Sequence, residues 1–281
     1  MTTLEVLNAA ASYLEKRGVE SARLNAEHLL AHVLGMPRRI ELYLQFERPL
    51  SEVERAPLRD LVKRRGEGVP LQHLLGEVEF CGRLFICDAR ALIPRPETEL
   101  LVELVLKESG AAASILDVAT GSGVIGLSLA LSRPDVAVTL CDISPEALSL
   151  AAANALRHGL ADKVARKESD LFDAVEGIFD VIVSNPPYIP TSEIANLDKN
   201  VQKYDPIMAL DGGEDGLMPY TNLLPTLKNY LEADGRIFLE FGINQSSDIM
   251  RLAEDSNATL IRVTKDLGGV ERVVEISYGD K

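Results

Sequence analysis

The sequence predicts an α/β protein in which a small N-terminal helical bundle precedes a larger domain built on a mostly parallel sheet. Three observations support this fold class. The first 76 residues carry apolar side chains at helical spacing. From about residue 114 onward, short apolar runs alternate with segments of helical periodicity. These runs are strongly apolar, which is typical of parallel strands covered by helices on both faces.

The N-terminal bundle, residues 1–76, is predicted from helical spacing and from residues typical of helix ends. The segment TLEVLNAAASYLEKRG ends at Gly18, where a left-handed C-terminal cap would lie. The second segment opens at Ser21, a candidate N-cap. The third opens at Ser51 with Glu54 three residues on, the spacing of a capping box, and ends in the basic run Lys63-Arg64-Arg65.

Residues 77–95 alternate apolar and polar side chains and end in a proline-rich stretch, which indicates a hairpin-like linker at a domain boundary. The second domain, residues 96–281, then alternates strands and helices. Strands are expected at 114–120, 137–142, 164–170, 179–185, 235–242, 259–266 and 271–278. Helices are expected near 123–132, 144–158, 219–232 and 245–256. The last two strands, joined by the short turn LGG, should pair antiparallel.

Composition narrows the class of protein. With 281 residues, 46% apolar and 26% charged, the chain is typical of a globular protein of two domains. No apolar run approaches the roughly 20 residues that span a bilayer, and the N-terminus lacks a secretory or transit pattern, so we expect no membrane association and a cytoplasmic location. Cys81, Cys87 and Cys141 form no CxxC pair and fit small buried side chains in a reducing compartment. No metal site is expected.

The net charge of −14 argues against a partner whose main feature is a phosphate backbone. Residues 1–78 carry acidic and basic side chains in equal number, so the whole excess of acid falls on the rest of the chain. We therefore expect no stable binding of nucleic acid.

The first strand of the second domain ends in a glycine-rich turn, LDVATGSGVIG. In open α/β sheets, ligands bind beyond the carboxyl ends of the strands, and glycines let the backbone approach them closely. A plain strand-to-helix connection is the alternative for this string taken alone. The candidate cofactor-binding residues of the turn are Asp117, Ala119, Thr120, Gly121, Ser122 and Gly123.

The ends of the next two strands strengthen the cofactor interpretation. Asp142, followed by Ile143, ends the second strand, where a carboxylate can accept hydrogen bonds from a ribose diol. The alternative for Asp142 is a helix N-cap, a role that Ser144 could fill instead. Asp170 ends the third strand within reach of an adenine amino group, with Leu171 placed to pack on the ring. Acidic groups beside the turn disfavour a pyrophosphate and favour a cationic cofactor, S-adenosyl-L-methionine.

The fourth strand ends in DVIVSNPPYIP, where two prolines that cannot donate hydrogen bonds stop a run of β-branched residues. An Asn-Pro turn at a strand end is the structural alternative. Together with ALIPRPETELLVE, DVATGSGVIGLSLA, DPIMALDGGEDGL and KDLGGVERVV, this stretch resembles the HemK/PrmC family over nearly the whole chain. The resemblance implies a protein-(glutamine-N5) methyltransferase that uses S-adenosyl-L-methionine to modify the Gly-Gly-Gln (GGQ) motif of class-1 peptide chain release factors. It also implies a Rossmann-like, seven-stranded class I methyltransferase domain behind a helical domain that docks the release factor.

The chemistry that the resemblance implies gives the prolines a role. An amide nitrogen is a poor nucleophile and must be held with its lone pair toward the methyl carbon. In the resemblance, the side-chain oxygen of Asn185 and the main-chain carbonyl of Pro186 accept the two N–H hydrogens of the glutamine, and Asn185 is also expected among the cofactor-binding residues. Pro186 and Pro187 fix φ and with it the direction of that carbonyl, and Tyr188 supplies a flat wall for the amide. No strong base is implied, because the methylated nitrogen loses its proton readily to water.

The chain departs from the family pattern at two positions. Ala119 stands where most members have glycine, so the turn either keeps an ordinary φ there or carries modest strain, which puts cofactor affinity in question. Leu171 stands where some relatives have an aromatic residue, which would weaken stacking on adenine.

Three further segments have two interpretations each. The roughly 30 residues after Tyr188, with their Asp-Pro and Gly-Gly pairs, form either an ordered lid or a disordered loop. In the linker, Arg95 and Glu97 either shape the site or belong to a structural hinge. The basic run at residues 63–65 either contributes to docking of the release factor or is a solvated helix end.

Two rival functions are weighed against the favoured one. A nucleic-acid exocyclic-amine methyltransferase, acting on adenine N6 or guanine N2, solves the same lone-pair problem with a similar motif but needs phosphate contacts that this acidic chain does not offer. A non-catalytic adaptor would have no use for an intact Asn185-Pro186-Pro187-Tyr188 set. A methyl-transfer assay separates these functions, and a monomer is the expected state.

Overall fold

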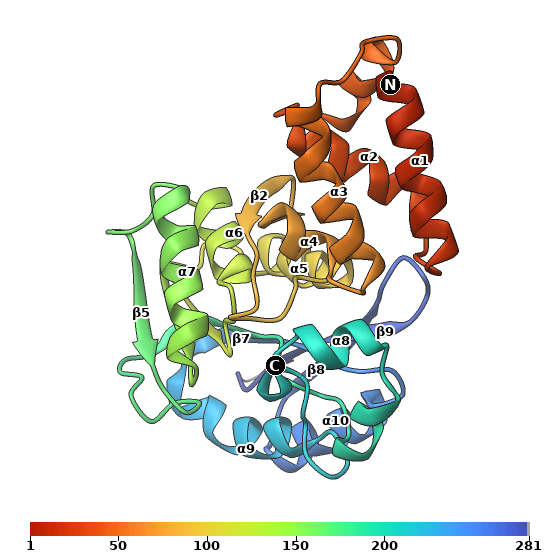
Figure 1. The fold of residues 1–281 in the computed structure, drawn as a ribbon. Coiled ribbons are helices and arrows are strands. Elements are labelled where there is room, and N and C mark those ends of the chain that lie inside the picture. Colours follow the sequence, from red (N-terminus) through yellow and green to blue (C-terminus); the bar gives the residue numbers. More distant parts are fainter. Residues whose placement is uncertain (280–281) are drawn as a thin grey trace. The chain divides into compact units, whose positions relative to one another are not determined.

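A computed structural model describes residues 1–279 of the chain, which fall into two compact units (Figure 1). One unit holds Met1–Glu77 together with Asp198–Tyr204; the other holds Val78–Leu197 and the chain from Asp205 onward. The segment expected as a linker therefore lies in the second unit from Val78 on. The return of seven residues, 198–204, to the helical unit was not anticipated from the sequence.

The first unit is a helical bundle. Its members are α1 (Thr3–Lys16), α2 (Ala22–Val33), the 3₁₀ helix η1 (Arg39–Gln45), α3 (Glu52–Gly66), α4 (Leu71–Leu75) and α8 (Lys199–Tyr204). Buried leucines from the first three α-helices form its core, including Leu7, Leu29, Leu30 and Leu58. α8 belongs here because the ring of Tyr204 packs edge-on against His73, with centroids 6.3 Å apart.

The expected helix ends are partly confirmed. Gly18 has a left-handed φ of +73° just after α1, and Ser51 and Glu54 form the capping box at the start of α3. The prediction for Ser21 is wrong, because this residue has a φ of +48° and its side chain caps nothing. The chain enters α2 through a left-handed turn instead, and the side-chain amide of Asn25 donates to the carbonyls of Glu20 and Ser21.

The second unit begins at Val78, within β1 (Glu77–Phe80), which forms a hairpin with β2 (Arg83–Ile86). The helices η2 (Pro96–Thr98) and α5 (Glu99–Glu108) follow. Its main sheet has seven strands in the order β5-β4-β3-β6-β7-β9-β8. The strands are β3 (Ser114–Val118), β4 (Ala137–Asp142), β5 (Val164–Glu168), β6 (Phe179–Ser184), β7 (Leu231–Glu240), β8 (Leu260–Lys265) and β9 (Glu271–Ser277). The first five are parallel, and β9 pairs antiparallel with both β7 and β8, as expected.

Helices cover both faces of this sheet, which confirms the predicted α/β class. α5, α6 (Val124–Ser132) and α7 (Pro145–Arg157) pack on one face, where Leu140 and Val181 meet Leu101 and Leu127. α9 (Met218–Leu227) and α10 (Ser246–Asp255) pack on the other, where Ile182 meets Tyr220 (Figure 1). The strands are apolar on both sides because each side faces its own core.

The boundary between α9 and β7 differs from the prediction by several residues, and β3 and β5 each end two residues earlier than expected. The helix expected near 219–232 ends at Leu227, and after the short 3₁₀ helix η5 (Lys228–Tyr230) the strand begins at Leu231 rather than 235. The loop after Tyr188 is ordered and carries the short helices η3 (Thr191–Asn196), α8 and η4 (Ile207–Ala209). Helices of three to six residues are too short to show a periodic apolar pattern.

Candidate active site

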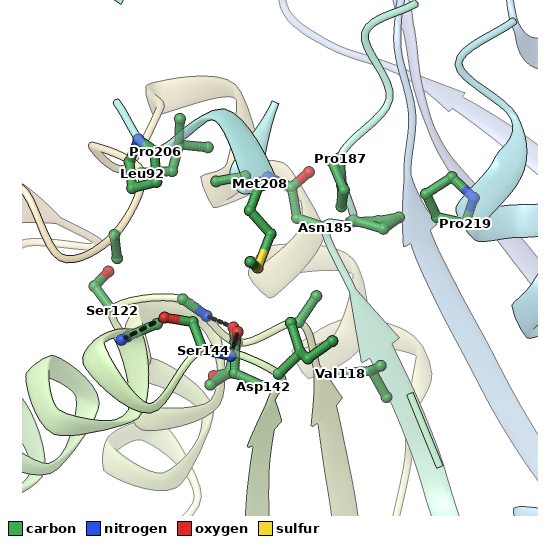
Figure 2. A pocket seen from close by; sticks show the side chains of 18 of the residues that line it. Leu92, Val118, Ser122, Asp142, Ser144, Asn185, Pro187, Pro206, Met208 and Pro219 are labelled. Atoms are coloured by element: carbon green, nitrogen blue, oxygen red, sulfur yellow. Dashed lines mark hydrogen bonds between the residues drawn. The ribbon is translucent and has the colours of Figure 1, made fainter. Parts of the chain in front are cut away.

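A cavity of about 940 Å³ opens above the carboxyl ends of β3, β4 and β6 in the second unit (Figure 2). Its wall combines the ends of these strands with the hairpin-to-α5 connection, η4 and the start of α9. Of the predicted site residues, the wall includes Ala119, Thr120, Gly121, Ser122, Asp142, Ile143, Asp170, Leu171, Asn185, Pro186 and Pro187. Asp117, Gly123 and Tyr188 are not among the residues of the wall.

The glycine-rich turn is held by left-handed backbone at three positions. Ala119 has a φ of +55°, Gly121 of +57° and Gly123 of +81°. Of the two possibilities that the sequence left for Ala119, the turn takes the strained one. A left-handed φ crowds the Cβ atom of alanine, whereas glycine adopts this φ freely. At Gly123, a Cβ atom would also lie 3.0 Å from the Cβ of Ala151, so this glycine allows close packing of α7 under the turn.

Asp117 is fully buried beneath the turn. Its Oδ2 accepts hydrogen bonds from the backbone N–H of Gly126 at 2.9 Å and from the Thr120 hydroxyl at 2.6 Å. Its Oδ1 has no partner among the described residues. Burial raises the pKa of Asp117 to about 7, against the lowering effect of these two hydrogen bonds. Asp117 therefore ties the start of α6 to the end of β3 and shapes the turn that faces the cavity.

Asp142 reaches the cavity wall. Its Oδ2 accepts from the backbone N–H of Gly121 at 2.8 Å, and its Oδ1 accepts from the N–H of Ser144 at 2.9 Å (Figure 2). Ser144 caps α7, because its hydroxyl accepts from the N–H of Ala147 at 3.1 Å. Ser144 is thus the N-cap of α7. The Asp142 carboxylate at the wall accepts these two hydrogen bonds and has further lone pairs that can accept hydrogen bonds from a ligand. Burial raises its pKa.

The second acidic strand end is more open. Asp170 is exposed, and Leu171 beside it is partly buried with a left-handed φ of +47°. Ile143, after Asp142, is 47% exposed although it lies on the cavity wall. Apolar side chains on the cavity wall beside two carboxylates are suited to a flat ring with polar edges.

Asn185 stands at the end of β6 on the far side of the cavity from Asp142 (Figure 2). Its side-chain Nδ2 donates to the hydroxyl of Thr98 at 3.2 Å, so its Oδ1 is not used in that bond. Pro186 is buried and Pro187 partly buried next to it. Tyr188 packs against the apolar core on the α9 side of the sheet, and burial raises its pKa to about 12.

The segment after Tyr188 is bound to the NPPY backbone. The N–H of Ile189 donates to the carbonyl of Leu210 at 3.0 Å, and the N–H of Gly212 donates to the carbonyl of Ile189 at 2.8 Å. A Cβ atom on Gly212 would lie 2.8 Å from the Cα of Tyr188, so only glycine allows this approach. The residues expected as a lid are therefore ordered, and Figure 2 shows Met208 reaching into the cavity from this segment.

Arg95 also belongs to the cavity wall. Its guanidinium pairs with the carboxylate of Asp205 at 2.7 Å, and the other carboxylate oxygen of Asp205 accepts from the N–H of Ile93 at 3.3 Å. The linker and the lid segment are thus joined by one buried carboxylate. This favours the interpretation in which Arg95 shapes the site.

The donor set fits S-adenosyl-L-methionine. Asp142 and Asp170 offer carboxylates to hydroxyl and amino groups, and an acidic wall suits a positively charged cofactor. Arg90 and Arg95 also line the cavity, but Asp88 and Asp205 pair with them. Asn185 on the opposite side offers an amide oxygen rather than a base or nucleophile, so the arrangement serves positioning more than proton abstraction.

Comparison with known proteins agrees with this chemistry. Residues 96–201 match the family model of the methyltransferase small domain, and residues 5–76 match that of the PrmC N-terminal domain. The fold and the site define an S-adenosylmethionine-dependent methyltransferase. The release factor glutamine methyltransferase of Geobacter sulfurreducens is 41% identical over 97% of this chain and 95% of its own length. That of Rhodopirellula baltica is 39% identical over 98% and 96%. The chain belongs to the release factor glutamine methyltransferase family.

Solved structures support the fold alone. A methyltransferase from Pyrococcus furiosus aligns with a TM-score of 0.53 and 18% identity over 70% of this chain and 89% of its own. The hMettl16 catalytic domain, solved in complex with a 3'UTR hairpin, aligns with a TM-score of 0.59 and 14% identity over 81% and 82%. Among residues 1–279, no helix has both the length and the apolar character to span a bilayer.

Sequence reasoning missed three polar residues around Asn185 and Tyr188. Thr98 accepts from Asn185, Gln245 donates to the carbonyl of Tyr188 at 2.9 Å, and Glu240 is a buried carboxyl at the end of β7. A carboxylate inside the apolar run GRIFLEFG was the available signal for Glu240. Thr98 and Gln245 carry no such signal, because only the fold brings them to the NPPY loop.

Proposed function

We propose that this chain transfers a methyl group from S-adenosyl-L-methionine to the side-chain amide nitrogen (N5) of the glutamine in the GGQ motif of class-1 peptide chain release factors. The observation that carries this proposal is the place of Asn185 and Pro186 on the cavity wall opposite the acidic residues of the cofactor side. Membership of the release factor glutamine methyltransferase family supports the choice of acceptor.

The cofactor residues in this proposal are those on the wall. The carboxylates of Asp142 and Asp170 bind hydroxyl and amino groups, Leu171 and Ile143 pack beside the ring, and the backbone of Ala119–Ser122 approaches the ligand. Asp117 acts indirectly by holding the turn. When bound, S-adenosyl-L-methionine supplies an electrophilic methyl group on a positively charged sulfur.

On the acceptor side, the Asn185 Oδ1 and the Pro186 carbonyl each accept one N–H of the substrate glutamine. This holds the nitrogen with its lone pair toward the cofactor side. Because two prolines fix φ in the loop before the substrate binds, little backbone entropy is lost when the amide is held. The nitrogen releases its proton to water once it carries the methyl group. Tyr188 supports the loop from the core, so its contribution is to fix the backbone of the two prolines.

Mass spectrometry of a release factor incubated with this protein and S-adenosyl-L-methionine tests the proposal. We expect the GGQ-containing peptide to gain the mass of one CH₂ group, the net result of replacing a hydrogen by a methyl. RNA and DNA are offered in parallel reactions. Methyl transfer to nucleic acid with none to the release factor would replace this function by that of an exocyclic-amine methyltransferase.

Location, assembly and docking form part of the same proposal. The three cysteines are free thiols, in keeping with work in the cytoplasm on a translation factor. We infer a monomer without stable nucleic-acid binding, which size-exclusion chromatography with light scattering and an RNA titration check. In the basic run of α3, Arg65 binds the side-chain oxygen of Asn25 and the carbonyl of Val69. Lys63 and Arg64 are exposed, in long ion pairs with Glu67 at 4.0 Å and Asp60 at 3.7 Å, so they are the members proposed for docking.

A further inference from the structure

We propose that Thr98 and Glu240 are positioning residues that fix which end of the Asn185 amide faces the substrate, an inference that rests on the proposed function. The side-chain amide of Asn185 has a donor end and an acceptor end of nearly equal size. Only the acceptor end can receive an N–H of the substrate glutamine. A site that depends on Asn185 therefore needs something that prevents the amide from turning over.

The sheet register brings Glu240 to Asn185. β6 and β7 are parallel neighbours, and Ser184 pairs with Leu239. The next residue on each strand is Asn185 and Glu240, so the two stand side by side where the strands end. The Glu240 main-chain carbonyl accepts from the hydroxyl of Tyr220 at 2.7 Å, which anchors this strand end to α9.

Thr98 comes from a different part of the chain and lies against the same pair. It ends η2, is 3% exposed, and accepts from Asn185 Nδ2 at 3.2 Å. A hydroxyl alone does not select one orientation of an amide, because it can accept from the NH₂ end or donate to the oxygen end. The selection requires a group that only accepts.

Glu240 is that group. Its side chain is 2% exposed, and its Oε2 has no hydrogen-bond partner among the described residues. The Glu240 carboxyl is hydrogen-bonded to the side chains of Thr98 and Asn185. An ionised carboxylate accepts and does not donate, so both bonds require a donor on the other side: the Thr98 hydroxyl and the NH₂ of Asn185. The Thr98 oxygen is then left to accept from Asn185. This chain of acceptors turns the Asn185 NH₂ inward and its Oδ1 toward the cavity.

The charges around Glu240 set the pH range of this arrangement. Burial raises the pKa of Glu240 to about 7; hydrogen bonds from Thr98 and Asn185 and the charge of Arg272 act against this, while Glu97 adds to it. Tyr188 and Tyr220 are the other titratable groups that face it. Below its pKa the carboxyl becomes a donor and no longer selects the orientation of the amide, so turnover should fall as the pH drops below about 7.

The test measures kcat, the KM for the release factor, direct cofactor binding and the pH profile. Thr98→Val removes the hydroxyl at nearly constant volume, and we expect it to lower kcat by about 10- to 100-fold while cofactor affinity stays within about 3-fold. Thr98→Ser keeps the hydroxyl and should recover most of that loss.

Glu240→Gln adds a donor where only an acceptor works. We expect a similar loss of kcat and the disappearance of the acidic limb of the pH profile near pH 7. Thr139→Val, in the middle of β4, is the matched control and should leave turnover unchanged.

The outcomes separate this inference from the proposed function. Wild-type protein that leaves the GGQ glutamine unmethylated would refute the proposed function itself. With an active wild type, the positioning role is refuted if Thr98→Val or Glu240→Gln keeps full turnover, or if Thr98→Ser loses as much as Thr98→Val. It is also refuted if turnover and cofactor affinity fall together, since that pattern indicates general damage. Should Thr98→Val not fold, Glu240→Gln and Thr98→Ser decide the matter.

Discussion

The ends of β3 and β6 lie side by side in the sheet but are fixed by opposite means. The turn after β3 takes left-handed φ values at Ala119, Gly121 and Gly123, and its hydrogen bonds to Asp117 come from within ten residues. The loop after β6 has φ fixed by two prolines, and its partners Thr98 and Gln245 come from distant parts of the chain. The turn is also bound to β4 through Asp142, 21 residues from Gly121, and to α7 through Asn154, 32 residues from Ser122. Thr98 is 87 residues from Asn185, and Gln245 is 57 residues from Tyr188. The cofactor side is therefore held by partners much nearer in sequence than those of the acceptor side.

This difference has a functional meaning. A cofactor shared by many enzymes can be bound by a short glycine-rich turn and the residues that follow the neighbouring strands. A poor amide nucleophile must be held within a narrow range of angles, so its binding loop needs support from several directions. We therefore expect changes near β6 to affect turnover, and changes near β3 to affect cofactor binding and stability.

The largest effect is expected for Asn185→Ala. Loss of the side-chain acceptor leaves one N–H of the substrate amide unheld, so kcat should fall by about 10²- to 10³-fold with little change in cofactor affinity. Asn229→Ala, in η5 away from the cavity, is the control. The mass-spectrometric assay and a cofactor titration provide the two measurements. An equal loss in both would contradict the division between the two strand ends.

A smaller effect is expected for Gln245→Ala. Its Nε2 donates to the carbonyls of Tyr188 and Gly216, and its Oε1 accepts from the N–H of Gly242 at 2.8 Å. Removing these bonds should cost about 1–3 kcal/mol of unfolding free energy and loosen the NPPY loop. Urea unfolding together with kcat checks this. Gln245→Glu keeps the acceptor, so its stability and kcat should lie between those of Gln245→Ala and the wild type. A Gln245→Ala variant as active as the wild type would show that the loop needs no remote support.

Asp117 should make stability depend on pH. Its pKa is raised from 3.8 to about 7, so the folded state binds a proton that the unfolded state has lost. Stability should therefore decrease as the pH rises from about 4 to about 7, by up to about 1.4 kcal/mol per pH unit from this group. Asp117→Asn cannot titrate and should flatten the profile by that amount. The unfolding free energy is measured by urea unfolding at several pH values between about 4 and about 7. If it changes with pH equally in the variant and the wild type, this prediction is wrong.

The smallest effect is expected for Ala119→Gly. Glycine relieves the left-handed strain at φ +55°, and the relief exceeds the added entropy of the unfolded chain, so we expect a gain of about 0.5–1 kcal/mol. Ala153→Gly inside α7, at an ordinary helical position, should instead destabilise by a similar amount. Thermal unfolding of both variants gives the comparison. A loss of stability at both positions would mean that the turn carries no usable strain.

The two strand ends also differ in how far the sequence could predict them. The α/β class, the seven strands, the antiparallel final pair and the ordered capping box of α3 follow from local patterns and are confirmed. The role of Ser144 at α7 was predicted because a cap is a local device. Thr98, Glu240 and Gln245 were not found, because their proximity to Asn185 and Tyr188 depends on strand register and helix packing that no short stretch of sequence encodes.

The return of Asp198–Tyr204 to the helical unit means that the two units are not consecutive pieces of sequence. A fragment cut after Glu77 would still carry α8, but without the ring of His73 and the backbone around Gly68 that it packs against. Such a fragment would expose apolar surface in the segment that leads directly to Asp205, Pro206 and Met208 of the cavity. The catalytic half of this chain is thus a discontinuous domain, and isolating it requires replacing α8 as well as removing the N-terminal helices.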